Sequence, residues 1–255
     1  MPVEFSYAQA RAQSRQGDRL SSDDWRLVES SRGLSHYLHT VRATPLAPRV
    51  QHFLATSSPH AIDRSLRQDW RMEVKNASRW APRSWRESIL WTAWLPDLAA
   101  IAYLLDDGRV LPWMTSDLSL SRFALDNGDA RRLAIAASEL SPLANNAGSE
   151  DLPDAWLRHW QSLWPAMDVD RAGLAELVTL LRKHWQATDE DVSESTGREH
   201  RDRLRERAAR FLRMRARQPV VVFCHLLLTG LELQRLREGL MRRALFNDVA
   251  AEARA

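Results

Sequence analysis

The stretch PVVVFCHLLL, residues 219–228, decides the fold of this chain. A proline suits the first turn of a helix, because its missing N–H would have no partner there, and no helix breaker follows before Asn247. The run is apolar on every face, whereas the charged continuation ELQRLRE, residues 232–238, begins a narrower apolar stripe. That stripe comprises Leu233, Leu236, Leu240 and Ala244. We therefore predict one long helix that begins inside the protein and ends at its surface.

The remaining segments have the same helical period. Apolar residues recur at helical spacing between Pro59 and Pro82, and a later helix is expected to bend at Pro96 before it runs to Leu105. The first of these stripes consists of Ile62, Leu66, Trp70, Val74 and Ala77. The loop Asn145–Ser149 is a candidate hinge. Strand alternation and hairpin signals are missing, so we predict an all-α fold, with residues 1–255 as a single helical domain.

Composition indicates a globular chain without membrane spans. With 255 residues, of which 44% are hydrophobic, the chain can bury a sizeable core. The apolar run from Val220 is too short to span a membrane, and residues 1–16 are too polar for a secretion signal. A single cysteine, Cys224, excludes a disulfide framework and fits the cytosol.

The motifs of the common catalytic and metal sites are absent. There is no P-loop, no dinucleotide-binding glycine pattern and no nucleophile elbow, and the histidine spacing gives no third ligand beside His36 and His39. The adjacent acids Asp106 and Asp107 could serve a helical enzyme, but such pairs usually mark a solvated turn. We therefore expect no catalytic residue, no metal, no cofactor and no small-molecule substrate.

Two groups of residues allow a binding interpretation. Between Arg198 and Arg217 nine arginines face three acids, which suits an adaptor for nucleic acid or an acidic protein partner. The apolar residues of the same segment, Leu204 among them, favour a helix with a solvated outer face. Trp156, Trp160 and Trp164 share one helix face, where core packing is favoured over a stacking platform for bases.

Three separated segments resemble the central-stalk subunit of V-type and A-type rotary ATPases, called C in archaea and bacteria and d in eukaryotes. The first contains Tyr7-Ala8-Gln9-Ala10-Arg11, then Arg19-Leu20-Ser21 and Trp25. The second joins Trp94 and Asp97 to the ladder Ile101, Leu104 and Leu105. The third is Glu232 followed by Arg235-Leu236-Arg237. Their order and rough spacing agree with the family across most of the chain.

The resemblance implies a funnel-like array of related helical units, at about 1–80, 81–150 and 151–255, in a shortened version. Such a subunit links the soluble rotor shaft to the membrane rotor ring of a proton- or sodium-translocating ATPase. It transmits torque and performs no chemistry, and it lies in the cytoplasm, held at the membrane through its partners. Neither nucleic acid nor a cofactor is expected. The residues expected to line the funnel and bind partners are Tyr7, Arg11, Asp97, Glu232, Arg235 and Arg237.

Overall fold

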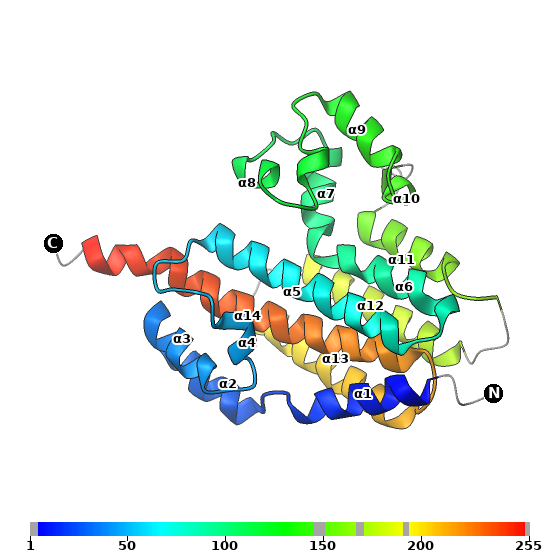
Figure 1. Cartoon of the computed structure of the whole chain (residues 1–255), viewed down its shortest axis with the longest axis horizontal. Coiled ribbons are helices and arrows are strands. Elements are labelled where there is room, and N and C mark those ends of the chain that lie inside the picture. Colours follow the sequence, from blue (N-terminus) through cyan, green and yellow to red (C-terminus); the bar gives the residue numbers. More distant parts are fainter. Residues whose placement is uncertain (1–4, 145–150, 167–170, 191–193, 253–255) are drawn as a thin grey trace. The chain divides into compact units, whose positions relative to one another are not determined.

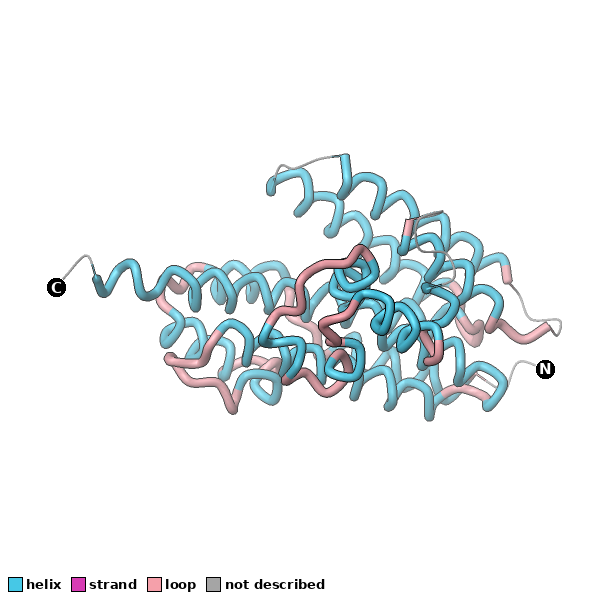
Figure 2. Tube along the Cα trace, turned by 90° about the horizontal axis from the view of Figure 1, so that it is seen from above, coloured by secondary structure: helices cyan, strands magenta, loops and turns pink. Residues whose placement is uncertain are grey.

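A computed structural model describes residues 5–144, 151–166, 171–190 and 194–252. The described residues form helices and loops without a strand (Figure 2), which confirms the all-α prediction. The α-helices are α1 (Ser6–Gly17), α2 (Ser22–Glu29), α3 (Leu34–Arg42), α4 (Ala47–Val50), α5 (Pro59–Trp80), α6 (Arg86–Trp91), α7 (Leu98–Leu105), α8 (Pro112–Thr115), α9 (Gly128–Ala136), α10 (Ser141–Ala144), α11 (Leu152–Ser162), α12 (Ala172–Glu190), α13 (Glu194–Met214) and α14 (Val220–Glu252). The 3₁₀ segments are η1 (Arg83–Trp85), η2 (Thr92–Asp97) and η3 (Ser121–Phe123).

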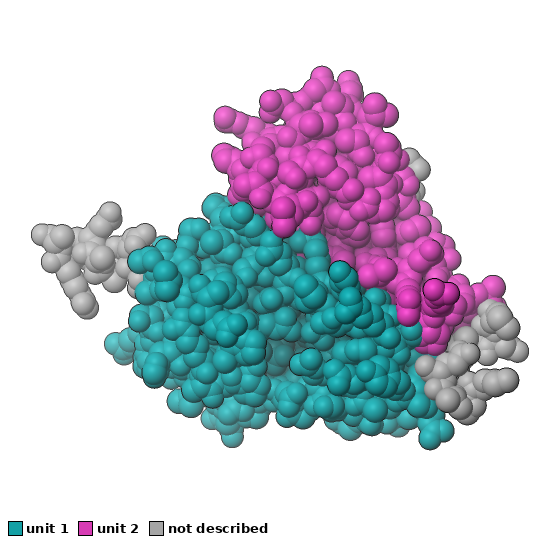
Figure 3. All heavy atoms as spheres, in the orientation of Figure 1, with its two compact units in different colours: residues 1–81, 201–255 teal, residues 82–200 magenta. Residues whose placement is uncertain are grey.

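The chain divides into two compact units, coloured separately in Figure 3. Unit 1 combines residues 1–81 with residues 201–255, and unit 2 comprises residues 82–200. The two ends of the chain therefore fold together. This division into compact units does not test whether segments of the chain resemble one another. The three related units at about 1–80, 81–150 and 151–255 therefore stay a prediction. The candidate hinge Asn145–Ser149 lies outside the described residues.

Helix α14 is the core of unit 1 and lies beside α5 (Figure 1). It begins directly after Pro219 and continues beyond Asn247 to Glu252. Residues 220–226 are all buried, and the later stripe keeps Leu233, Leu236 and Leu240 buried. The prediction of a helix that starts inside the protein and narrows to one buried stripe is confirmed.

Helix α5 supplies the opposite wall of this core. Ser58 caps it by accepting a hydrogen bond from the Ala61 N–H, and Pro59 occupies its first turn. The predicted stripe from Ile62 to Ala77 is buried throughout. The same face also carries Glu73, only 5% exposed, which brings a charge into an otherwise apolar contact.

Unit 2 is packed around tryptophans. The rings of Trp156 and Trp160 in α11 stack with centroids 5.8 Å apart, and Trp91 of α6 stacks on Trp156 at 6.4 Å. Trp164 and Trp185 meet this group edge-on. Trp156 and Trp160 are each 1% exposed, so the predicted packing role of the α11 face is confirmed for both.

Unit 2 contains an apolar segment that runs from Arg83 to Leu105. The composition of the chain predicts no membrane span, but this segment is long and apolar enough to cross a membrane. Half of its most apolar window is buried inside the structure, as in the core segment of a folded domain. It is also interrupted by η2, which contains Pro96 at the predicted bend.

Candidate functional site

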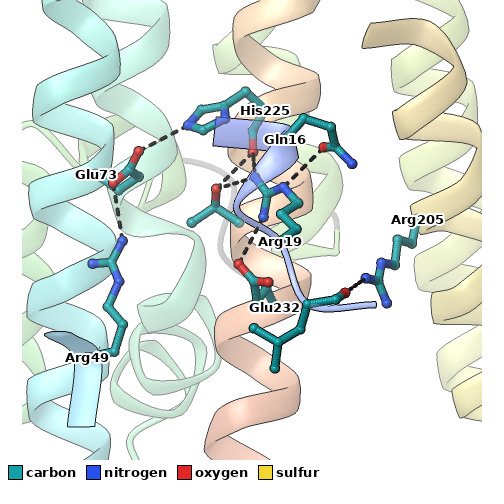
Figure 4. Close-up of polar contacts among 9 residues, drawn as sticks. Gln16, Arg19, Arg49, Glu73, Arg205, His225 and Glu232 are labelled. Carbon is teal, nitrogen blue, oxygen red and sulfur yellow. Dashed lines mark hydrogen bonds and ion pairs between the residues drawn. The ribbon is translucent and has the colours of Figure 1, made fainter. Parts of the chain in front are cut away.

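The polar seam of unit 1 is the most distinctive polar arrangement in the described structure (Figure 4). We use this name for the side chains that join the linker after α1 to α14, α14 to α5 and α4 to α5. They are Arg19, Arg49, Glu73, His225, Thr229 and Glu232.

Arg19 connects the start of the chain to α14. Its Nη1 donates to Glu232 Oε2 at 3.1 Å, and its Nη2 donates to Thr229 Oγ1 at 2.8 Å and to the His225 carbonyl at 3.2 Å. Its Nε donates to Gln16 Oε1. The Arg19 and Glu232 side chains are only 7% and 15% exposed. The guanidinium therefore replaces most of its hydration shell with acceptors from the protein.

His225 connects α14 to α5. Its Nε2 lies 3.0 Å from Glu73 Oε1, and Arg49 Nη2 donates to the other oxygen of the same carboxylate at 3.2 Å. The Trp80 ring lies against the imidazole, with centroids 5.1 Å apart. Each carboxylate oxygen of Glu73 thus has its own partner.

Burial and neighbouring charges shift the pKa values of two groups in the seam, His225 and Glu73. Burial lowers the pKa of His225 and outweighs the hydrogen bond with Glu73, which by itself raises this pKa. Burial by itself raises the pKa of Glu73, but the hydrogen bond from His225 and the Arg49 charge outweigh it and hold this pKa at about 2. The contacts of this seam join α14 to α5 and to the linker after α1.

The three α14 residues with a predicted partner role lie in ion pairs within the chain. Glu232 pairs with Arg19, and Arg237 Nε lies 2.5 Å from Asp63 Oδ1. Arg235 forms two hydrogen bonds to the Glu29 carboxylate, at 2.6 and 2.8 Å. Part of each charge is therefore used inside unit 1.

The other predicted partner residues lie apart from the seam. Tyr7 of α1 is 60% exposed, and the Arg11 guanidinium lies over the Trp80 ring at 5.6 Å from its centroid. Asp97 belongs to unit 2 and is 1% exposed. The structure brings Arg11 and Glu232 into one unit and buries Asp97 in the other.

Sequence reasoning missed the seam residues on α5 and within the apolar run. Glu73 follows Trp70 by three positions and precedes Ala77 by four, so helical spacing alone places it on the buried face. His225 stands inside the run that the sequence predicts to be fully buried. A buried acid and a buried histidine each require a partner, and this requirement was the available signal.

The other chemistry-bearing residues have structural surroundings. Asp107 is in the left-handed region with φ 59°, accepts hydrogen bonds from Arg132 and lies 3.5 Å from Arg131 Nη2 in an ion pair, so it closes a turn. Cys224 is buried, which raises the pKa of its thiol. Within the described ranges, no group of three or more His, Cys, Asp or Glu side chains could hold a metal ion.

Comparison of the chain with family models, with curated proteins and with solved structures finds no match.

Proposed function

We propose that this chain is a non-catalytic central-stalk subunit of a V/A-type rotary ATPase, linking the soluble shaft to the membrane rotor ring. One observation supports the proposal beyond the resemblance itself. Arg19 belongs to the first family-like segment and Glu232 to the last, and their side chains form a buried ion pair at 3.1 Å. Two segments that are far apart in sequence are thus parts of one packed unit.

A socket that transmits torque must be stiff, because a wall that yields would dissipate the rotary strain. Close-packed helices have low compressibility, and α14 lies along α5 with buried side chains between them. The polar seam adds directional contacts, since a shift of either helix would separate His225 from Glu73. These properties suit a coupling element.

The partner contacts of this subunit belong to the proposal as well. Tyr7 is exposed on α1, and the Arg237 side chain keeps 47% of its surface open, so both can reach a second subunit. Arg11, Glu232 and Arg235 would hold the wall from which these contacts are made. The funnel-like arrangement and its shortening are further parts of the proposal, but Asp97, predicted to line the funnel, is 1% exposed and does not offer its side chain to a partner.

Copurification from native membranes tests this function. The tagged chain should elute with a membrane rotor ring and a soluble shaft subunit, and a Tyr7→Ser/Arg237→Ser variant should lose at least one of them. Leu27→Ser is the matched control, because Leu27 is 66% exposed on α2 and has no part in the proposal. Elution of the unmodified chain alone would contradict the proposal.

A further inference from the structure

The inner face of α13 determines which of its arginines are exposed. Leu204, Ala208 and Leu212 are buried in unit 1, and Gln9 Nε2 of α1 donates to the Leu212 carbonyl at 3.2 Å. The helix is therefore held in one rotational setting about its own axis.

Two of the arginines are used inside unit 1. Arg201 pairs with Glu238 of α14 at 3.2 Å, and Arg205 donates to the Leu20 carbonyl at 2.8 Å. Arg201 and Arg205 both lie on α13 beside its buried stripe of Leu204, Ala208 and Leu212. Their charges serve the packing of α13 on its neighbours.

The outward arginines form a second set, which we call the arginine face. Arg203, Arg207, Arg210 and Arg213 are all exposed, and Met214 beside them is 73% exposed. Arg203, Arg207, Arg210 and Met214 are spaced by four, three and four residues, the spacing of side chains that meet a second helix lying alongside. At about 1.5 Å per residue this row is roughly 16 Å long.

We propose that the arginine face binds an acidic amphipathic helix of another protein. Guanidinium groups match carboxylates in planar, paired hydrogen bonds. The exposed thioether of Met214 continues the row and offers an apolar contact that a helix can fill and a phosphate backbone cannot. This combination favours a protein helix over a nucleic acid. The inference does not depend on the proposed central-stalk role.

Each exposed ion pair contributes only about 0.2–1 kcal/mol, so the binding needs several pairs at once and is sensitive to salt. A direct test uses the full chain and a fluorescent peptide of about 21 residues, or six turns, with glutamates and one leucine at the complementary four-three spacing. A scrambled peptide of equal composition and a duplex DNA of similar length are the other probes. Anisotropy at low salt gives the affinity for each.

The variant Arg207→Glu/Arg210→Glu should bind the patterned peptide at least about tenfold more weakly. Its matched control is Arg83→Glu/Arg86→Glu, because both residues are exposed arginines of unit 2 and the change in net charge is the same. That control should lose no more than about twofold. A peptide with lysine in place of glutamate should bind the first variant and not the unmodified chain.

Equal binding of the patterned and scrambled peptides would overturn the proposal, as would equal losses in the two variants. Tighter binding of the DNA than of the patterned peptide would also overturn it, in favour of a phosphate-binding face. None of these outcomes bears on copurification with a rotor ring, so failure here and failure of the proposed function are distinguishable.

Discussion

The two units of this protein have different kinds of interior. Unit 1 has buried charges between its helices, with Arg19 and Glu232 3.1 Å apart and His225 3.0 Å from Glu73. Unit 2 has stacked indoles at its centre, with Trp156 and Trp160 5.8 Å apart. Neither arrangement is a minor feature, since these side chains are nearly all buried.

Burial has opposite energetic meanings in the two units. Burying an indole removes a large apolar area from water and is favourable by itself. When an ion pair is buried, the loss of hydration cancels most of the attraction between its charges. Removing one partner, however, leaves the other charge buried without compensation. We therefore expect unit 2 to gain stability from its central residues, and the seam of unit 1 to act mainly by specifying which helices meet.

Replacing Trp156 with alanine should have the largest effect. The side chain is 1% exposed, and its removal leaves a cavity beside Trp91 and Trp160, so we expect a loss of about 4 kcal/mol in the free energy of unfolding of unit 2. Urea unfolding followed by circular dichroism measures it. Leu118→Ala, at a position 81% exposed, should stay within about 0.5 kcal/mol. A loss below about 1 kcal/mol for Trp156→Ala would show that the indoles are not the core of unit 2.

Replacing Arg19 with alanine should cost unit 1 about 3 kcal/mol, because Glu232 would stay buried without its counterion. The double variant Arg19→Met/Glu232→Leu should recover most of this loss, since apolar side chains fill the same space without desolvated charge. If Arg19→Met/Glu232→Leu loses as much stability as the single variants Arg19→Met and Glu232→Leu added together, the two residues are not coupled, and the loss does not come from an unpaired partner. Urea unfolding of the two single variants and the double variant decides between these outcomes.

Gly239→Ala should cost about 2 kcal/mol through overpacking within unit 1. A methyl group there would lie 2.2 Å from the Tyr37 hydroxyl and 2.7 Å from the adjacent ring carbon, so the ring would have to move. The Tyr37 hydroxyl is buried without a hydrogen-bond partner, and Tyr37→Phe should therefore reduce the cost of the alanine, as measured by urea unfolding in both backgrounds. An equal cost in the two would assign the effect to the helix backbone instead.

Lowering the pH should weaken unit 1 through its histidine, by at most about 1.4 kcal/mol between about pH 7.5 and about pH 5.5. Burial holds the pKa of folded His225 below its ordinary 6.5, so the unfolded chain binds a proton that the folded chain does not. The contribution of His225 to the free energy of unfolding is therefore fully present well above pH 6.5, and it decreases as the pH falls through the pKa of the unfolded histidine. Further loss follows below about pH 4.5, where unfolded Glu73 is protonated and folded Glu73, with a pKa of about 2, is not.

The variant His225→Gln should remove the first part of this pH dependence, because glutamine can donate to Glu73 without titrating. Urea unfolding at a series of pH values measures the slope. His36→Gln, at an exposed position of α3, is the matched control and should keep that dependence. An unchanged slope in His225→Gln would assign the effect to other groups.

Much of the fold could be predicted from local pattern. The start of α14 after Pro219, its buried first half and the stripe of α5 all follow from apolar spacing, which needs no knowledge of distant residues. The candidate site was less accessible. The charged continuation of the last helix points to Glu232 and Arg235, but their counterions Arg19 and Glu29 lie more than two hundred positions away in the sequence.

Helical periodicity is a local property of the chain, and it is enough to establish the all-α class, the long last helix and the burial of Trp156, Trp160 and the apolar runs. Which charges are used internally and which are displayed depends instead on tertiary contacts. Arg205 and Arg207 are two residues apart in one arginine-rich helix, yet the first donates to the Leu20 carbonyl and the second is exposed. The physical reason is that the rotational setting of α13 depends on the surface against which Leu204 and Leu212 are buried, and that surface is assembled from the other end of the chain.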